Sequence, residues 1–228
     1  MSWPAGTFAI GVGTMKARRL LSLAALLLGL ILIIKGGYMQ AKAEFAQFLI
    51  ARAFEQSLVD GQPHKPWDWA DTYPVARLEL LKGGLPQQPL YVLAGASGRN
   101  LAFGPAWLEG TARPGAPGHS VIAGHRDSHF AQLRGMAVGD KLLLTPFSGR
   151  QQLFEVSALR IVSEHDGQAL AEVEDGLTLV TCYPFDALGA RSEKRLLVFA
   201  KPMAKPRANA AAQPAIGMTR LRPSRLAS

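Results

Sequence analysis

The chain has a single cysteine, Cys182, among its 228 residues. No disulfide can therefore form within the chain, and the thiol is either a small buried hydrophobic group or a reactive one. Oxidising compartments favour paired cysteines, so a lone cysteine is more informative if this part of the chain lies outside the cytoplasm. In that setting an unpaired thiol indicates a free reactive group.

The two ends of the chain lack acidic residues. Residues 1–19 and 201–228 hold nine of the 25 Lys and Arg residues, which leaves 16 basic residues against 17 acidic ones in residues 20–200. The net charge of +8 therefore comes from the ends. A nucleic-acid-binding face needs cations clustered within the fold, and the middle of the chain has no such cluster, so we expect no nucleic-acid partner. Basic ends suit the surface of an anionic membrane.

Internal repeats are missing, and helical patterns are few beyond residue 60. Between Tyr73 and Ala200, short apolar runs are separated by Gly, Pro and Asp, which is typical of an antiparallel barrel or sandwich and predicts a mainly β fold. The predicted strands are residues 75–80, 90–94, 120–123, 141–145, 151–161, 176–181 and 195–200. Short helices are expected at 99–107 and 130–133.

One long apolar run is present near the N-terminus. Residues 20–39 are almost entirely apolar, and about 20 residues are enough to cross the hydrocarbon core of a membrane. Basic residues precede the run, so the positive-inside rule places the N-terminus in the cytoplasm and the rest of the chain outside. An uncleaved anchor is the preferred interpretation, and a cleaved signal peptide is the alternative. Met15 is a candidate start as well as Met1.

The organisation that follows has five parts. Phe45, Phe48, Leu49 and Ala53 lie at helical spacing, and the polar segment 60–66 breaks that pattern. The last 27 residues contain Ala, Pro and Arg without a usable apolar face, which predicts disorder. The predicted parts are a cytoplasmic N-terminus (1–19), a transmembrane anchor (20–39), an amphipathic helix with a linker (40–66), a β-rich domain (67–201) and a disordered basic tail (202–228).

Three predicted strands carry reactive side chains at their ends. Cys182 closes one strand, His125 follows a second and Arg195 opens a third. A thiol is nucleophilic once ionised, and a nearby cation favours its thiolate form. An imidazole can protonate a leaving amine and deprotonate an incoming one. A guanidinium stays charged and offers several donors to an oxyanion. Together these residue types predict a cysteine acyl-transfer site.

These segments resemble the sortase family. The resemblance covers roughly residues 74–201 and rests, in this order, on GHSVIAGHR (118–126), TLVTC (178–182) and RLLVFA (195–200). The segment WDWADTYPVARL (67–78) resembles the class GN sortases of Gram-negative proteobacteria.

The resemblance implies a closed eight-stranded β-barrel and cysteine transpeptidation. It implies that Cys182 is the nucleophile, that His125 is the acid and base, and that Arg195 holds the substrate and its developing oxyanion. The expected partners are a target protein with a C-terminal Leu-Pro-x-Thr-Gly-like sorting signal and an amine acceptor. The acyl group would pass to the cysteine as a thioester and then to the amine, with no cofactor. The expected location is the inner membrane, as a single-pass protein with its catalytic domain on the periplasmic side.

Three other functions are alternatives to transpeptidation by a sortase. A purely hydrolytic cysteine peptidase would use the same residues without an amine acceptor. A membrane-tethered β-barrel binding module would leave Cys182 inert. An L,D-transpeptidase usually has an arginine soon after its cysteine, whereas Tyr183 and Pro184 follow here, which argues against it.

Some residues have competing assignments. His125 and His129 are spaced as zinc ligands could be, but no further ligand motif accompanies them, so no metal site is expected. The acidic residues Glu172, Glu174 and Asp175 could bind calcium, although a solvated loop is preferred. Arg191 is the rival to Arg195 for the role of the catalytic arginine. Thr181 should point away from Cys182, into the core.

Overall fold

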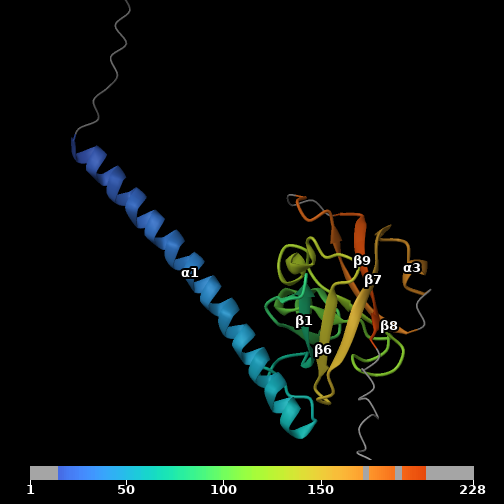
Figure 1. Cartoon of the computed structure of the whole chain (residues 1–228). Coiled ribbons are helices and arrows are strands. Elements are labelled where there is room, and N and C mark those ends of the chain that lie inside the picture. Colours follow the sequence, from blue (N-terminus) through green and yellow to red (C-terminus); the bar gives the residue numbers. More distant parts are fainter. Residues whose placement is uncertain (1–14, 172–174, 188–191, 204–228) are drawn as a thin grey trace, which may run out of the picture.

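The computed structural model describes residues 15–171, 175–187 and 192–203 and consists of one long helix beside a β-barrel (Figure 1). The helices are α1 (Met15–Asp60), α2 (Gly98–Phe103), the 3₁₀ helix η1 (His129–Leu133) and α3 (Gln168–Ala171). The strands are β1 (Pro74–Lys82), β2 (Leu85–Pro86), β3 (Leu90–Ala94), β4 (Ala106–Trp107), β5 (His119–Ala123), β6 (Lys141–Pro146), β7 (Gln152–Ser163), β8 (Gly176–Tyr183) and β9 (Lys194–Pro202).

The sheet closes on itself. Neighbouring strands follow the order β1-β3-β4-β5-β8-β9-β7-β6, and β6 pairs back onto β1, while β2 lies outside this ring as a short extension of β1. The ring therefore has eight strands, which confirms the predicted eight-stranded barrel. Most pairs are antiparallel, but β3 runs parallel to β4 and β5 runs parallel to β8.

The interior of the barrel is apolar because alternate residues of its strands point inward. Leu78, Ile122, Leu144, Leu179 and Val198 are among the residues that form this core and are fully buried. A β-strand places successive side chains on opposite faces, so the same strands also present a second set of side chains on the outside. The same alternation determines the face of β8 on which Cys182 lies.

Each of the seven predicted strands is present, with ends that differ by two residues at most. The strands β2 and β4 were missed because two residues are too few to show an alternating pattern. The predicted helix at 99–107 was too long. The helix α2 ends at Phe103, and Trp107 belongs to β4, where it pairs with Ile122 of β5.

The C-terminal part of α1 packs on the barrel. Ile50, Ala53, Phe54 and Ser57 are buried at helical spacing, and Gln47 donates a hydrogen bond of 2.6 Å to the carbonyl of Phe103. The predicted apolar face was therefore rotated: it included Ala53, but its Phe45 and Phe48 are exposed. The side chains that face the barrel are Ile50, which packs with Leu93, and Phe54, whose ring lies against that of Tyr91.

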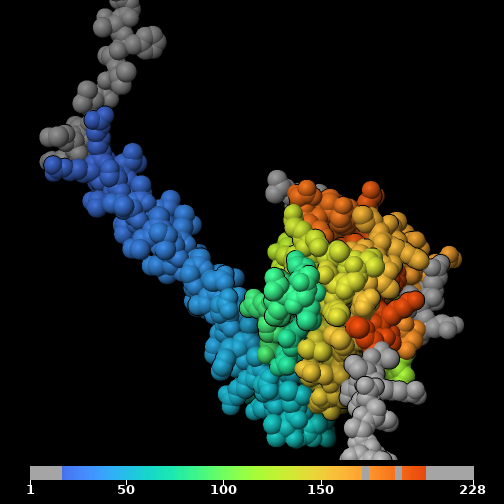
Figure 2. Space-filling view, in the orientation of Figure 1, coloured from blue at the N-terminus to red at the C-terminus, as the bar shows by residue number. Residues whose placement is uncertain are grey.

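The N-terminal part of α1 projects away from the barrel, as Figure 2 shows. From Ala17 to Asp60 the helix is long and apolar enough to cross a membrane by length and composition, and its most apolar stretch is not buried within the protein. Leu20, Leu26 and Ile33 are among the large apolar side chains that this stretch exposes. The helix is unbroken from the apolar stretch to the residues that dock on the barrel.

Candidate active site

Strand pairing sets Cys182 beside Arg195 and brings the strand that precedes His125 next to them. Cys182 on β8 lies directly opposite Arg195 on β9 in the antiparallel ladder. On its other side β8 pairs in parallel with β5, where Ala123 lies opposite Val180. Cys182 and Arg195 therefore form one row across β8 and β9, and His125 follows two residues after the end of β5, at the same end of the sheet.

The row lies on the outside of the barrel. Leu177 and Leu179 of β8 point into the core, so the alternate residues Val180 and Cys182 point outward. Val180 packs there against a small apolar cluster of buried residues that includes Leu197, and α3 contributes Ala169 to the same cluster. Cys182 lies two residues beyond Val180 on the same face of β8, and it is a free, partly exposed cysteine.

The backbone around His125 is held by three hydrogen bonds. The amide of Gly124 donates to the carbonyl of Val180 at 3.0 Å, which extends the β5–β8 pairing by one residue. The hydroxyl of Thr181 donates to the carbonyl of Gly124 at 2.8 Å, and the amide of Phe130 donates to the carbonyl of His125 at 3.0 Å. His125 itself is exposed, so a backbone fixed by these bonds presents an accessible imidazole.

Gly124 permits this arrangement because a larger residue does not fit. A Cβ atom at this position would lie 2.6 Å from the ring of Phe130, which is fully buried. The ring is fixed by the core and cannot yield easily. Glycine before His125 therefore lets η1 pack closely under the histidine.

Thr181 is buried, as the alternation predicted, and its hydroxyl has a structural partner. Alternation alone places Thr181 in the core but carries no sign of its hydrogen bond to Gly124. Because that bond ties β8 to the residue before His125, Thr181 links the strand of the thiol to the loop of the imidazole.

We expect Thr181→Val to lower activity about tenfold, because a displacement of the catalytic group by about 1 Å can cost up to a hundredfold. The change keeps the shape but leaves the Gly124 carbonyl without its partner, which also costs about 1–3 kcal/mol of stability. Thr178→Val is the matched control, since Thr178 lies on the same strand and its hydroxyl is 2.7 Å from a ring nitrogen of His119. Turnover and melting temperature are to be measured for both. Equal turnover in the two variants would contradict the link to His125.

The guanidinium of Arg195 is held by backbone carbonyls at the start of β9 and by the carboxylate that directly follows β7. Its Nη1 donates to the carbonyls of Ser192 at 2.5 Å and Lys194 at 3.0 Å. Its Nη2 donates to Oε2 of Glu164 at 2.6 Å. These bonds use three of the five N–H donors of a guanidinium. Arg195 therefore stands beside Cys182 with a defined orientation.

The residues with competing assignments lie as follows. His129 is half-buried in η1, and burial, with the nearby His125 as a smaller cause, lowers its pKa below the ordinary value. Among the described residues no group of three or more His, Cys, Asp or Glu side chains could hold a metal ion. Asp175 accepts a hydrogen bond from the amide of Gly118 at 3.1 Å. Glu172, Glu174 and Arg191 lie outside the described residues.

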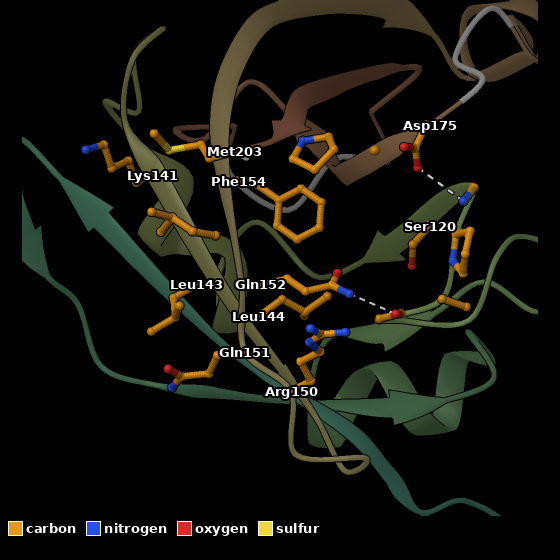
Figure 3. Close-up of a pocket in the computed structure, with 17 residues that line it drawn as sticks. Ser120, Lys141, Leu143, Leu144, Arg150, Gln151, Gln152, Phe154, Asp175 and Met203 are labelled. Atoms are coloured by element: carbon orange, nitrogen blue, oxygen red, sulfur yellow. Dashed lines mark hydrogen bonds between the residues drawn. The ribbon is translucent and has the colours of Figure 1, made fainter. Parts of the chain in front are cut away.

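A cavity of about 960 Å³ lies at the opposite end of β8 (Figure 3). Asp175 and Gly176, at the start of β8, line it together with Ser120, Gln152 and Phe154. Cys182 does not line the cavity, and it lies six positions beyond Gly176 on the same strand, which corresponds to about 20 Å of strand. This cavity is therefore not the place where a substrate meets the thiol.

A comparison with protein families matches residues 87–203, just over half of the chain, to the sortase domain. Among solved structures, sortase A from Corynebacterium diphtheriae is similar at 27% identity with a TM-score of 0.52, over 62% of this chain and 66% of that chain. This chain thus covers slightly less than two thirds of that structure. A sortase D5 transpeptidase from Clostridium perfringens shares 20% identity with a TM-score of 0.51, over 66% of this chain and 94% of that chain, which shows the fold alone. A search of the curated proteins found no match.

The matched region contains β3 to β9 and with them Cys182, His125 and Arg195. The barrel order, the match to the sortase domain and the similar structures agree with the resemblance seen in the sequence. The chain therefore belongs to the sortase family.

Proposed function

We propose that this protein is a membrane-anchored transpeptidase that cuts a C-terminal Leu-Pro-x-Thr-Gly-like sorting signal and joins the target protein to an amine. The observation that carries the proposal is the cross-strand pair of Cys182 and Arg195 on β8 and β9, with His125 two residues beyond the end of the neighbouring β5. A nucleophile, an acid–base group and an oxyanion donor are the parts that acyl transfer through a thioester needs.

The reaction has two steps. The Cys182 thiolate attacks the scissile carbonyl, Arg195 stabilises the oxyanion, and His125 gives a proton to the departing amine as the C–N bond breaks. The target then remains on Cys182 as a thioester. An incoming amine attacks that thioester, loses a proton to His125 and releases the thiolate, so the enzyme returns to its first state. Water in place of the amine gives hydrolysis.

The apolar part of α1 is proposed to anchor the protein in the inner membrane, with the barrel on the periplasmic side. The helix has the length and composition for one crossing, and basic residues precede its apolar run. Protease added to spheroplasts should digest the barrel. Protection of the barrel would place it in the cytoplasm instead. The assignment to the class GN subgroup stays a prediction from residues 67–78.

The test uses the full chain in detergent, because α1 buries Ile50 and Phe54 against the barrel and a fragment lacking them would lose part of its core. The chain is incubated with a Leu-Pro-x-Thr-Gly peptide library, with and without a small amine, and the products are read by mass spectrometry. Cleavage after Thr with capture of the amine supports transpeptidation. Cleavage without capture indicates a hydrolytic peptidase, and no cleavage with an unreactive Cys182 indicates a binding module.

A further inference from the structure

Arg195 has a carboxylate partner that the proposed reaction has not yet used. Glu164 follows the last residue of β7, and its Oε2 lies 2.6 Å from Nη2 of Arg195. The pair is largely withdrawn from solvent: the side chain of Glu164 is 15% exposed and that of Arg195 is 26% exposed. A charged hydrogen bond of this length at a partly buried place is among the stronger polar contacts in proteins.

The position of Glu164 is itself fixed by the sheet. Ser163 lies opposite Lys194 in the β7–β9 ladder, and the amide of Glu164 donates to the carbonyl of Glu193 at 2.6 Å, which continues the ladder by one more residue. The carboxylate is therefore held on the side of Arg195 that faces away from Cys182. Arg195 stands between its two cross-strand neighbours, with Cys182 on β8 and Val162 on β7.

We infer that Glu164 is a positioning residue, which orients the guanidinium of Arg195 so that it can stabilise the oxyanion formed at Cys182. Without a partner, an arginine side chain samples many rotamers and loses conformational freedom when it binds. With Nη1 bound to the carbonyls of Ser192 and Lys194 and Nη2 bound to Glu164, the guanidinium plane is set before the substrate arrives. Donors aligned in advance are what makes such a group effective.

This inference rests on the proposed function, and a double-mutant cycle tests it with the full chain and the peptide found above. We expect Glu164→Ala to lower kcat/KM roughly 10- to 100-fold, since a misplacement of about 1 Å can cost a hundredfold. Glu164→Gln keeps an acceptor oxygen and should lose less. In the Arg195→Ala background, Glu164→Ala should cause almost no further loss, because its effect passes through the arginine.

Glu79→Ala is the matched control. Glu79 pairs with Arg77 at 3.1 Å on β1, outside the row, with side chains that are 24% and 28% exposed. It should cost a similar amount of thermal stability and leave kcat/KM unchanged, which separates a loss of stability from a loss of positioning.

Three results would overturn the role of Glu164 while leaving the proposed function intact. They are unchanged turnover in Glu164→Ala, faster turnover in Glu164→Ala, and a full additional loss in the double variant. Faster turnover would mean that Glu164 holds Arg195 away from the substrate. No turnover by the wild-type chain with any peptide would count against the proposed function, and this role would fall with it.

Discussion

Cys182→Ala should abolish cleavage of the signal peptide and transfer to the amine, with a fall in turnover of roughly three orders of magnitude or more. The thiol is the group that forms the covalent intermediate, and Cys182 is the sole cysteine of the chain, so no other thiol can replace it. The folded state should survive, because the side chain is partly exposed at the end of β8 and alanine is only slightly smaller. Turnover by mass spectrometry and the melting temperature are the two measurements.

Two further variants make this result specific to the thiol. Cys182→Ser keeps the size of the side chain but replaces the thiol with a far less acidic hydroxyl, so it should be inactive as well. Val180→Ala shortens a side chain on the same strand and the same face while it keeps the thiol, so it should remain active. Turnover by Cys182→Ala at the wild-type rate would exclude the acyl-transfer mechanism.

His125→Ala is expected to lower turnover about 10²- to 10⁴-fold, which is the usual contribution of a general acid–base group. Because the His125 side chain is exposed, its removal leaves a site that solvent can enter. Imidazole added to the solution should therefore restore part of the activity of His125→Ala and none of the activity of Cys182→Ala. Turnover is to be measured over a series of imidazole concentrations.

His129→Ala is the control for the histidine. His129 lies four residues further along and is close enough for its pKa to be lowered in part by the charge of His125, after the larger effect of burial. The lowered pKa favours the neutral form of His129. We expect this variant to retain nearly full activity. An equal loss in the two variants would mean that the acid–base role is not specific to His125.

Short-range patterns in the sequence were enough for the elements of the barrel. Burial alternates from Ala76 to Leu80, and the predicted strands agree with the observed ones to within two residues. The reactive side chains could also be predicted, since Cys182, His125 and Arg195 each lie at the end of an apolar run. Alternation depends on neighbours within one strand, so it can be read directly from the chain.

The sequence alone did not show which strands are neighbours. The parallel pairing of β5 with β8 joins residues that are 57 positions apart. The antiparallel pairing of β8 with β9 joins residues that are 11 to 23 positions apart. This pairing sets Cys182 opposite Arg195 and brings the end of β5, which precedes His125, to the same end of the sheet. The sequence predicted the site from the residue types at three strand ends and from the resemblance to sortases, whereas strand pairing is decided by the packing of the whole core.

The contact of Glu164 with Arg195 and the face of α1 that docks on the barrel could not be predicted from the sequence for the same reason. Glu164 stands in a polar stretch after β7 and resembles any solvated carboxylate until the ladder with β9 brings it to Arg195. The helix has several apolar residues around its circumference, and the barrel surface selects Ile50 and Phe54 over Phe45. The sequence by itself determined the strands, the apolar helix and the three reactive residues. Only the tertiary structure decided their neighbours, because contacts between distant segments depend on the packing of the whole barrel.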